Sequence, residues 1–182
     1  NTFTLEIDGP TEIQGAVGTE QQVEFFLTLD HQGESPGARA WQFVLEAREA
    51  ALLDIGIEGT DVEAVIDKDC TEEFPLCYRI REQISGDGHS AAMSVALSQC
   101  DSRILLPNTK YKIARILVAT TIDDGRDAMG LALVTSDHCG LGAAAITLVD
   151  AKISPNGPTK KFTPVLDRRL IELSPADDTA SE

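Results

Sequence analysis

The chain has 182 residues and a formal net charge of −15, from 30 acidic and 15 basic side chains. This length suits one domain, which buries roughly 70% of its unfolded surface without needing disulfides. The acidity repels nucleic-acid phosphates and anionic lipid headgroups, which argues against both as partners. No apolar run reaches the ~20 residues that span a bilayer, which argues against membrane insertion. Because the sequence starts at Asn1, we expect a processed product or an excised fragment.

The N-terminal third predicts short strands in which apolar and polar residues alternate. The alternation occupies residues 3–7, stops at Gly9-Pro10, and returns over residues 23–29 and 38–47. An apolar run at 51–57 predicts a further strand. Such alternation turns one face of a strand toward a core and the other toward solvent.

Trp41, the only tryptophan, lies in the stretch SPGARAWQFVLEAREA. It shares one side of an extended segment with Phe43, Leu45 and Ala47, while Val44 is the one apolar residue among the polar ones opposite. A sugar-binding platform needs two or three exposed aromatic rings, and aromatic residues are only 5% of the chain. We therefore predict that Trp41, Phe43 and Leu45 are core residues buried between two sheets.

The rest of the chain continues with strands and turns. Residues 78–84 and 91–97 flank the turn SGDG as a hairpin would, and LLPNT forms a turn before a long strand at 110–120. That strand is apolar on both faces toward its end, which favours a central position or a bulge. Further strands are predicted at 129–135, 144–150 and 169–173.

Helical signals are sparse. TDVE at Thr60–Glu63 has the spacing of a capping box and predicts one or two helical turns that end by Ile66. About nine strands and at most one short helix predict an all-β protein, an antiparallel β-sandwich or jelly roll. Alternating strand–helix units do not occur, which excludes Rossmann and TIM-barrel folds. We expect one sandwich domain over 1–173, and a disordered acidic tail or the start of a linker over 174–182.

The sequence contains no catalytic signature. His31, His89 and His138 each adjoin turn residues, where an exposed polar histidine is the ordinary explanation. No nucleophile elbow, P-loop or dinucleotide-binding motif occurs. His138 and Cys139 are neighbours, and neighbouring side chains of an extended chain point apart, which argues against a thiol–imidazole pair. A carboxylate dyad could arise by chance among so many acidic residues, but no motif marks one. We expect that the chain is not an enzyme.

Two acidic turns are candidate calcium ligands. DDGRD offers Asp123, Asp124 and Asp127, and DKD offers Asp67 and Asp69. Calcium takes six to eight oxygen ligands, which carboxylate-rich turns can provide. Neither stretch has the spacing of a calcium-binding loop, so an ordinary charged turn is the alternative and no cofactor is expected.

The chain has four cysteines, with no CxxC pair and no histidine at a zinc-ligand spacing. This predicts two disulfides and an oxidising compartment, with four free thiols in a cytosolic protein as the alternative. Cys70 and Cys77 bracket a short loop, while Cys100 and Cys139 each follow the end of a predicted strand. We expect the pairs Cys70–Cys77 and Cys100–Cys139, although four cysteines allow three pairings.

The order of the strands is itself informative. VEFFLTLD, GARAWQFVLEA and ALLDIGIEG follow one another, and ILLPNTKYKIARILVAT comes later. This pattern, from Val23 to Leu173, resembles the cohesin-like domains, which belong with the extracellular carbohydrate-binding-module-like β-sandwiches. The family's second-strand run is matched by Gly37, Trp41, Phe43, Leu45 and Ala47. The four cysteines and the insertion 67–82 depart from the cellulosomal pattern.

The resemblance implies a non-catalytic protein-interaction or structural domain of a secreted or cell-surface assembly. Its partner would be a protein, and self-association is open. The alternatives are a carbohydrate-binding module, a subunit of an extracellular fibre or surface layer, and a secreted hydrolase. The shortage of aromatic residues argues against the first, and the lack of a catalytic constellation against the last.

Overall fold

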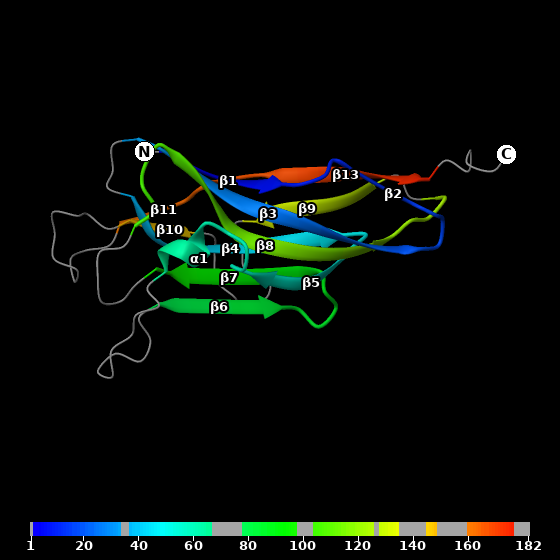
Figure 1. The fold of residues 1–182 in the computed structure, drawn as a ribbon, viewed down its shortest axis with the longest axis horizontal. Coiled ribbons are helices and arrows are strands. Elements are labelled where there is room, and N and C mark those ends of the chain that lie inside the picture. Colours follow the sequence, from blue (N-terminus) through cyan, green and yellow to red (C-terminus); the bar gives the residue numbers. More distant parts are fainter. Residues whose placement is uncertain are drawn as a thin grey trace.

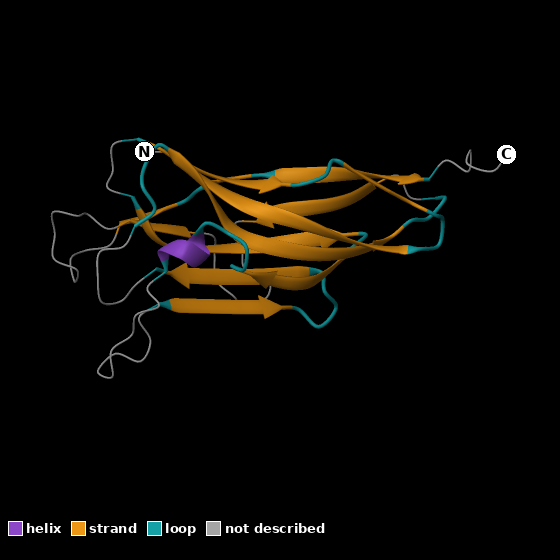
Figure 2. Ribbon diagram, viewed as in Figure 1, coloured by secondary structure: helices purple, strands orange, loops and turns teal. Residues whose placement is uncertain are grey.

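The computed structural model describes residues 2–33, 37–66, 78–97, 104–125, 128–134, 145–148 and 160–176 (Figure 1). These residues are mostly strands, and the helix among them, α1 (Val62–Val65), has four residues (Figure 2). Two sheets pack face to face, which confirms the predicted all-β sandwich. Among the described residues no helix is long and apolar enough to cross a membrane.

The first sheet, called sheet A here, has five strands. Their order is β12 (Val165–Leu166), β1 (Thr2–Asp8), β3 (Glu20–Gln32), β8 (Thr109–Thr121) and β5 (Ala51–Gly56). As its two apolar faces predict, β8 is central, and its register with β3 shifts between Leu27 and Thr28. The shift leaves Ile113 without a cross-strand partner, and both Ile113 and Ala114 are buried.

The second sheet, called sheet B, has eight strands. They are β11 (Lys160–Phe162), β10 (Ala145–Leu148), β4 (Ala38–Arg48), β9 (Ala128–Val134), β13 (Arg168–Pro175), β2 (Glu12–Gly15), β7 (Ser90–Ala96) and β6 (Arg79–Ile84). One side of β4 pairs with β7, which pairs in turn with β6. The other side of β4 pairs with β10 over Ala38–Gln42 and with β9 over Val44–Arg48.

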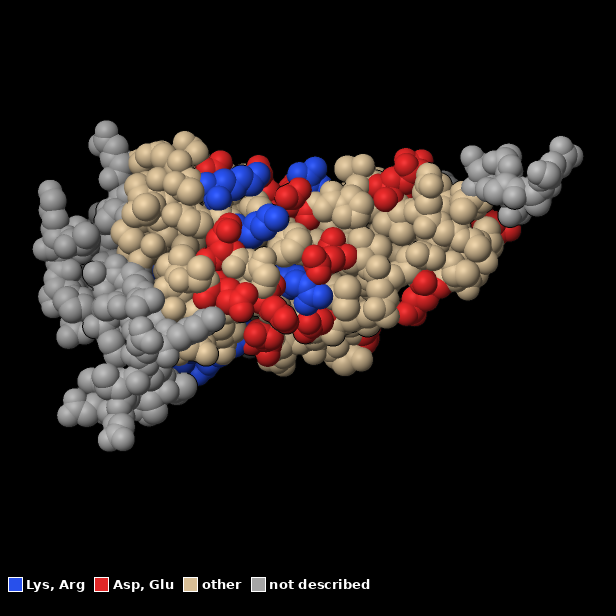
Figure 3. Space-filling view, in the orientation of Figure 1, with Lys and Arg blue, Asp and Glu red and all other residues tan. Residues whose placement is uncertain are grey.

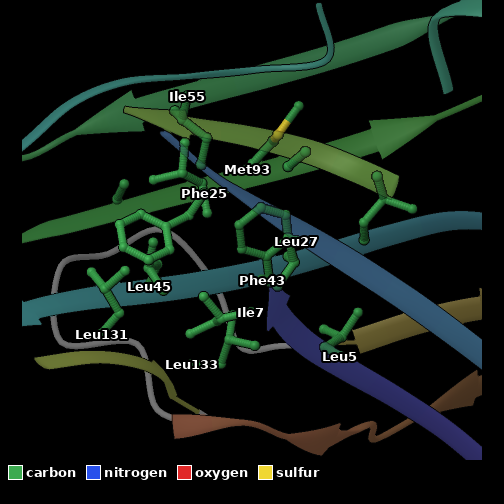
Figure 4. Packing of buried hydrophobic residues seen from close by; sticks show 14 of the residues in the cluster. Leu5, Ile7, Phe25, Leu27, Phe43, Leu45, Ile55, Met93, Leu131 and Leu133 are labelled. Atoms are coloured by element: carbon green, nitrogen blue, oxygen red, sulfur yellow. The ribbon is translucent and has the colours of Figure 1, made fainter. Parts of the chain in front are cut away.

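The core lies between the sheets and follows the alternation of the strands. Trp41 is 2% exposed, and Phe43 and Leu45 are completely buried, so the predicted core positions on β4 are confirmed. Side chains of β1, β3, β4 and β9 meet in this space (Figure 4): Leu5, Ile7, Phe25, Leu27, Phe43, Leu45, Leu131 and Leu133.

Two details of the sheets differ from the prediction. The described chain holds thirteen strands rather than about nine, because β2, β11 and β12 have two to four residues and are too short to show alternation. The sheets are also mixed rather than purely antiparallel, since β12 runs parallel to β1 and β2 runs parallel to β13.

The short helix forms where it was predicted, but its capping differs. Asp61, not Thr60, is the N-cap residue, and the Thr60 hydroxyl donates to the Ile57 carbonyl instead. Glu63 accepts a hydrogen bond from the Gly59 N–H, and the Asp61 carboxylate accepts one from the Lys112 N–H of β8. The predicted capping box is therefore wrong, because the Thr60 hydroxyl does not cap the helix. The Asp61 carboxylate instead holds the helix against β8.

The last strand runs past the expected end of the domain. β13 continues to Pro175 and pairs there with Gly15 of β2, whereas the sequence pattern ends at Leu173. Residues from Asp177 onward lie outside the described residues, so a disordered tail stays a prediction.

Candidate functional site

The outward-facing side of sheet B, called face B here, carries small side chains on β7 and β9 between larger polar ones. It forms because Trp41, Phe43 and Leu45 turn inward and so place the even-numbered residues of β4 outward. The registers align four rows across the sheet: Arg81–Ser94–Gln42, Gln83–Ala92–Val44–Val134, Glu46–Ala132–Arg168 and Arg48–Gly130–Leu170. Alanine, serine and glycine along the middle of the rows allow another molecule to approach the sheet closely.

A hollow of about 400 Å³ lies over β4, β9 and β13. Gly130 and Ala132 form its floor, because their side chains are too small to fill the space between β4 and β13. Leu170 lines one wall and is 77% exposed, the highest value among the large hydrophobic residues described. We call this space the β13 hollow.

A second hollow, of about 240 Å³, lies over β4, β7 and β6. Ala92 and Met93 add apolar surface, and its other lining residues are polar: Gln42, Arg81, Glu82, Gln83 and Ser94. We call it the β6 hollow. Val44 lies on face B between the two hollows and is nevertheless 1% exposed. Face B therefore has a closed centre with a hollow on either side.

Among the described residues, four arginines of face B lack an ion-pair partner, whereas Arg169 at the rim of the β13 hollow pairs with Asp167 at 2.8 Å. Arg48, Arg79, Arg81 and Arg168 are exposed, and no carboxylate of the described residues lies within ion-pairing distance of them. The β13 hollow is lined by three arginines and one acidic residue, Glu46. Face B thus offers unpaired guanidinium donors on a protein whose net charge is −15.

The outward-facing side of sheet A has a different charge pattern. Lys110 forms an ion pair with Glu6, and Arg115 pairs with Glu24 at 2.5 Å and with Asp54 at 3.5 Å. Figure 3 shows basic and acidic side chains interleaved in this way over the middle of the molecule. These cations are neutralised by their neighbours, unlike the arginines of face B.

The free edge of β6 carries an inward-pointing charge. Glu82 lies opposite the buried Met93 of β7, on the side of the strand that continues the inner face, and at this free edge it stays partly exposed. Burial raises the pKa of the Glu82 carboxyl, and the nearby charge of Asp54 raises it further. Inward-pointing charges on edge strands oppose pairing with a strand of another molecule. The geometry therefore favours face B over this edge as an interaction surface.

His31 differs from its prediction. It was expected to be exposed in a turn, but β3 continues to Gln32, which places His31 on the inner side of the strand, 2% exposed. Its ring stacks on Phe3 with 4.3 Å between the ring centroids. His89 is exposed as expected, and His138 lies outside the described residues.

The structure brings together no predicted ligand set. Asp123 and Asp124 lie in the turn after β8, where the Asp123 carboxylate accepts a hydrogen bond from the Gly125 N–H at 3.2 Å. Asp67, Asp69 and Asp127 lie outside the described residues. Within the described ranges no three His, Cys, Asp or Glu side chains are placed to hold a metal ion. The four cysteines, at positions 70, 77, 100 and 139, are also outside these ranges. Their pairing as Cys70–Cys77 and Cys100–Cys139 therefore stays a prediction.

Sequence reasoning concentrated on the apolar side of each strand and did not identify face B. The signal that could have found it is the opposite parity. Ala92, Ser94 and Ala96 share one side of β7, and Gly130 and Ala132 share one side of β9. An outward face of such small residues leaves room for a partner.

Comparisons with known proteins agree with this architecture. No protein-family model and no curated protein matches the sequence. Among solved structures, the seventh ScaB type I cohesin of Pseudobacteroides cellulosolvens is 11% identical to this chain. The superposition covers 100% of this chain and 97% of the cohesin, with a TM-score of 0.64.

Two further cohesins are similar. One, from a type I cohesin–dockerin complex of Clostridium thermocellum, is 14% identical, with 95% of this chain and 99% of that chain covered and a TM-score of 0.55. The other, a type II cohesin domain from the cellulosome of Acetivibrio cellulolyticus, is 11% identical, with 94% and 95% covered and a TM-score of 0.53. At such identities the likeness concerns the fold alone, and it shows that this chain has a cohesin-like β-sandwich fold.

Proposed function

We propose that this chain is a non-catalytic protein-interaction module of an extracellular assembly, and that its partner protein binds face B. The observation that carries the proposal is a face with two hollows, floored in part by small residues, on a cohesin-like sandwich that matches cohesins over nearly their whole length. One of those cohesins was solved in complex with a dockerin, and another comes from a cellulosome.

The shape of face B supports a protein partner. The floor residues Gly130 and Ala132 allow close approach, and Leu170 offers an exposed apolar contact beside the exposed Arg168. Interfaces between proteins commonly combine an apolar centre with a polar rim. The two hollows, one on either side of the closed centre, would receive side chains of the partner.

A sugar-binding role is less well supported. Trp41 is in the core, and no aromatic residue is among the exposed large hydrophobics of the described residues. Carbohydrate platforms present exposed aromatic rings on which the sugar stacks. The side chains that line the β6 hollow are amides, a hydroxyl, charged groups, an alanine and a methionine, with no ring among them.

The test begins by identifying the partner through face B itself. A photo-crosslinking amino acid at position 94 should capture a protein from the extracellular fraction of the source organism, whereas one at Gln22, exposed on sheet A, should not. The captured protein is then purified, and its affinity for the wild-type chain is measured by calorimetry.

Two bulky substitutions then test the face. Ala132→Tyr fills the floor of the β13 hollow and should weaken binding by at least about tenfold. Gln22→Tyr adds the same side chain to the outside of sheet A and should leave the affinity unchanged. Binding that survives Ala132→Tyr, or a chain that binds polysaccharide and no protein, would contradict the proposal.

A further inference from the structure

We infer that the partner engages face B through carboxylates, bridging two pairs of arginines on opposite sides of the closed centre. This inference rests on the proposed function and gives the chemistry of the partner. Arg79 and Arg81 form one pair on β6, and Arg48 and Arg168 form the other beside the β13 hollow.

Each pair is arranged to bind an anion. Arg79 and Arg81 are two residues apart on one strand, so their side chains leave the same face of the sheet about 7 Å apart. Arg48 and Arg168 stand on two sides of the floor formed by Gly130 and Ala132. A guanidinium donates two parallel hydrogen bonds to a carboxylate, which makes carboxylates its preferred protein partner.

Because these arginines form no ion pair with a described carboxylate, their guanidinium groups can bind a carboxylate of another protein. In an acidic chain, surface cations have many carboxylates within reach. Lys110 and Arg115 on sheet A form ion pairs with Glu6 and Glu24. Arg48, Arg79, Arg81 and Arg168 have no carboxylate partner among the described residues. Exposed arginines that keep all their donors available can form charge-assisted hydrogen bonds with another molecule.

The spacing of the two pairs suggests an extended acidic contact. Arg81 and Arg168 are four strands apart across the sheet and four residues apart along it, roughly 20–25 Å. A helix of about 15 residues, or a shorter extended segment, spans that distance. The partner is therefore expected to carry carboxylates at both ends of one such segment.

An acidic protein fits face B better than an acidic polysaccharide. Leu170 is 77% exposed between the arginine groups of the β13 hollow, and an apolar side chain of a protein would cover it. A polyuronate has no such group, and the described residues of face B include no aromatic ring to stack against a sugar.

The experiment measures the affinity of the full chain for a fluorescent glutamate oligomer of about 20 residues, long enough to reach both arginine pairs. Fluorescence anisotropy is recorded at 0.05 M and 0.15 M salt, because the overall charge of −15 repels the probe and is screened beyond about 8 Å at the higher salt. Oligolysine of equal length and polygalacturonate serve as comparison probes.

Three double variants decide the outcome. Arg79→Gln with Arg81→Gln, and Arg48→Gln with Arg168→Gln, should each weaken binding of the glutamate oligomer at least about fivefold. Lys110→Gln with Lys112→Gln removes the same charge from the outside of sheet A and should change the affinity less than twofold. Circular dichroism confirms that each variant is folded.

Several results would overturn the inference: no binding of the glutamate oligomer, equal loss in the lysine variant, or preferential binding of polygalacturonate. The same variants are also titrated with the partner identified through position 94. If Ala132→Tyr abolishes partner binding but both arginine variants bind normally, the proposed function stands and the acidic contact is wrong. If the chain binds no protein at all, the proposed function itself fails.

Discussion

Trp41 carries a buried polar atom whose energetic cost can be measured. The side chain is 2% exposed, and no acceptor in the described part of the chain lies within hydrogen-bonding distance of its indole N–H. A buried donor without a partner costs about 1–3 kcal/mol. Replacing Trp41 by Phe removes this donor and keeps an aromatic ring in the core.

The two effects of Trp41→Phe oppose each other. Phenylalanine buries about 50 Å² less apolar surface than tryptophan, which at 25 cal/mol per Å² lowers the free energy of unfolding by about 1.2 kcal/mol. Losing the unpaired donor raises it by about 1–3 kcal/mol. We therefore expect the net change in the free energy of unfolding for Trp41→Phe to lie between about −0.2 and +1.8 kcal/mol. Trp41→Ala should cost about 3–5 kcal/mol.

Urea unfolding followed by circular dichroism measures both variants, because Trp41→Phe removes the only tryptophan and with it the fluorescence signal. Phe43→Leu is the control, since Phe43 is completely buried and has no polar atom. If Trp41→Phe destabilises the chain as much as Trp41→Ala, the indole N–H has a partner and the reasoning is refuted.

Three further predictions concern His31, Gly37 and the cysteines. Burial lowers the pKa of His31 below its ordinary value of 6.5; the unfolded chain therefore binds a proton that the folded chain does not, and the free energy of unfolding should fall as pH drops below about 6.5. A series of urea titrations at different pH measures this, and a slope that survives in His31→Gln would contradict it. Gly37→Ala should cost about 3 kcal/mol, because φ is 134° and a Cβ atom would lie 2.2 Å from the Leu105 carbonyl oxygen. Gly59→Ala, with φ of 73° and open space, should cost only about 1 kcal/mol, and equal losses in urea unfolding would refute the steric argument. Non-reducing peptide mapping should find the two disulfides Cys70–Cys77 and Cys100–Cys139. Four alkylatable thiols in the native protein would contradict this and remove an argument for secretion.

The alternation of apolar residues was sufficient to predict the sandwich. Phe43 and Leu45 lie in the core because a strand that carries three large apolar residues on one side has only one way to bury them. The interior position of β8 in its sheet was also among the expectations from the sequence, and β8 pairs with β3 along one edge and with β5 along the other.

Other features depend on contacts between distant segments. β2 becomes a strand only because β13 lies beside it, and its parallel pairing is not encoded in the four residues of β2. The N-cap of α1 moved to Asp61 because its carboxylate reaches the Lys112 N–H, a contact between residues far apart in sequence. The inward position of His31 depends on how far β3 continues along β8, to the pair of His31 with Thr109.

Face B was the hardest feature to foresee. Each of its arginines looks like an ordinary solvated side chain in the sequence. Arg48 and Arg168 come together only because β9 pairs with β4 on one side and with β13 on the other. A surface that spans several strands becomes visible only when the order of the strands is known.

The most direct test of the central claim is a nuclear magnetic resonance titration of the isotope-labelled chain with its purified partner. Amide signals of β6, β7, β4 and β9 should shift, together with the arginine side-chain signals of face B. Signals on the outer side of sheet A, such as those of Gln22 and Lys112, should stay unchanged. Shifts confined to sheet A, or to the free edge of β6, would contradict the assignment of face B as the interaction surface.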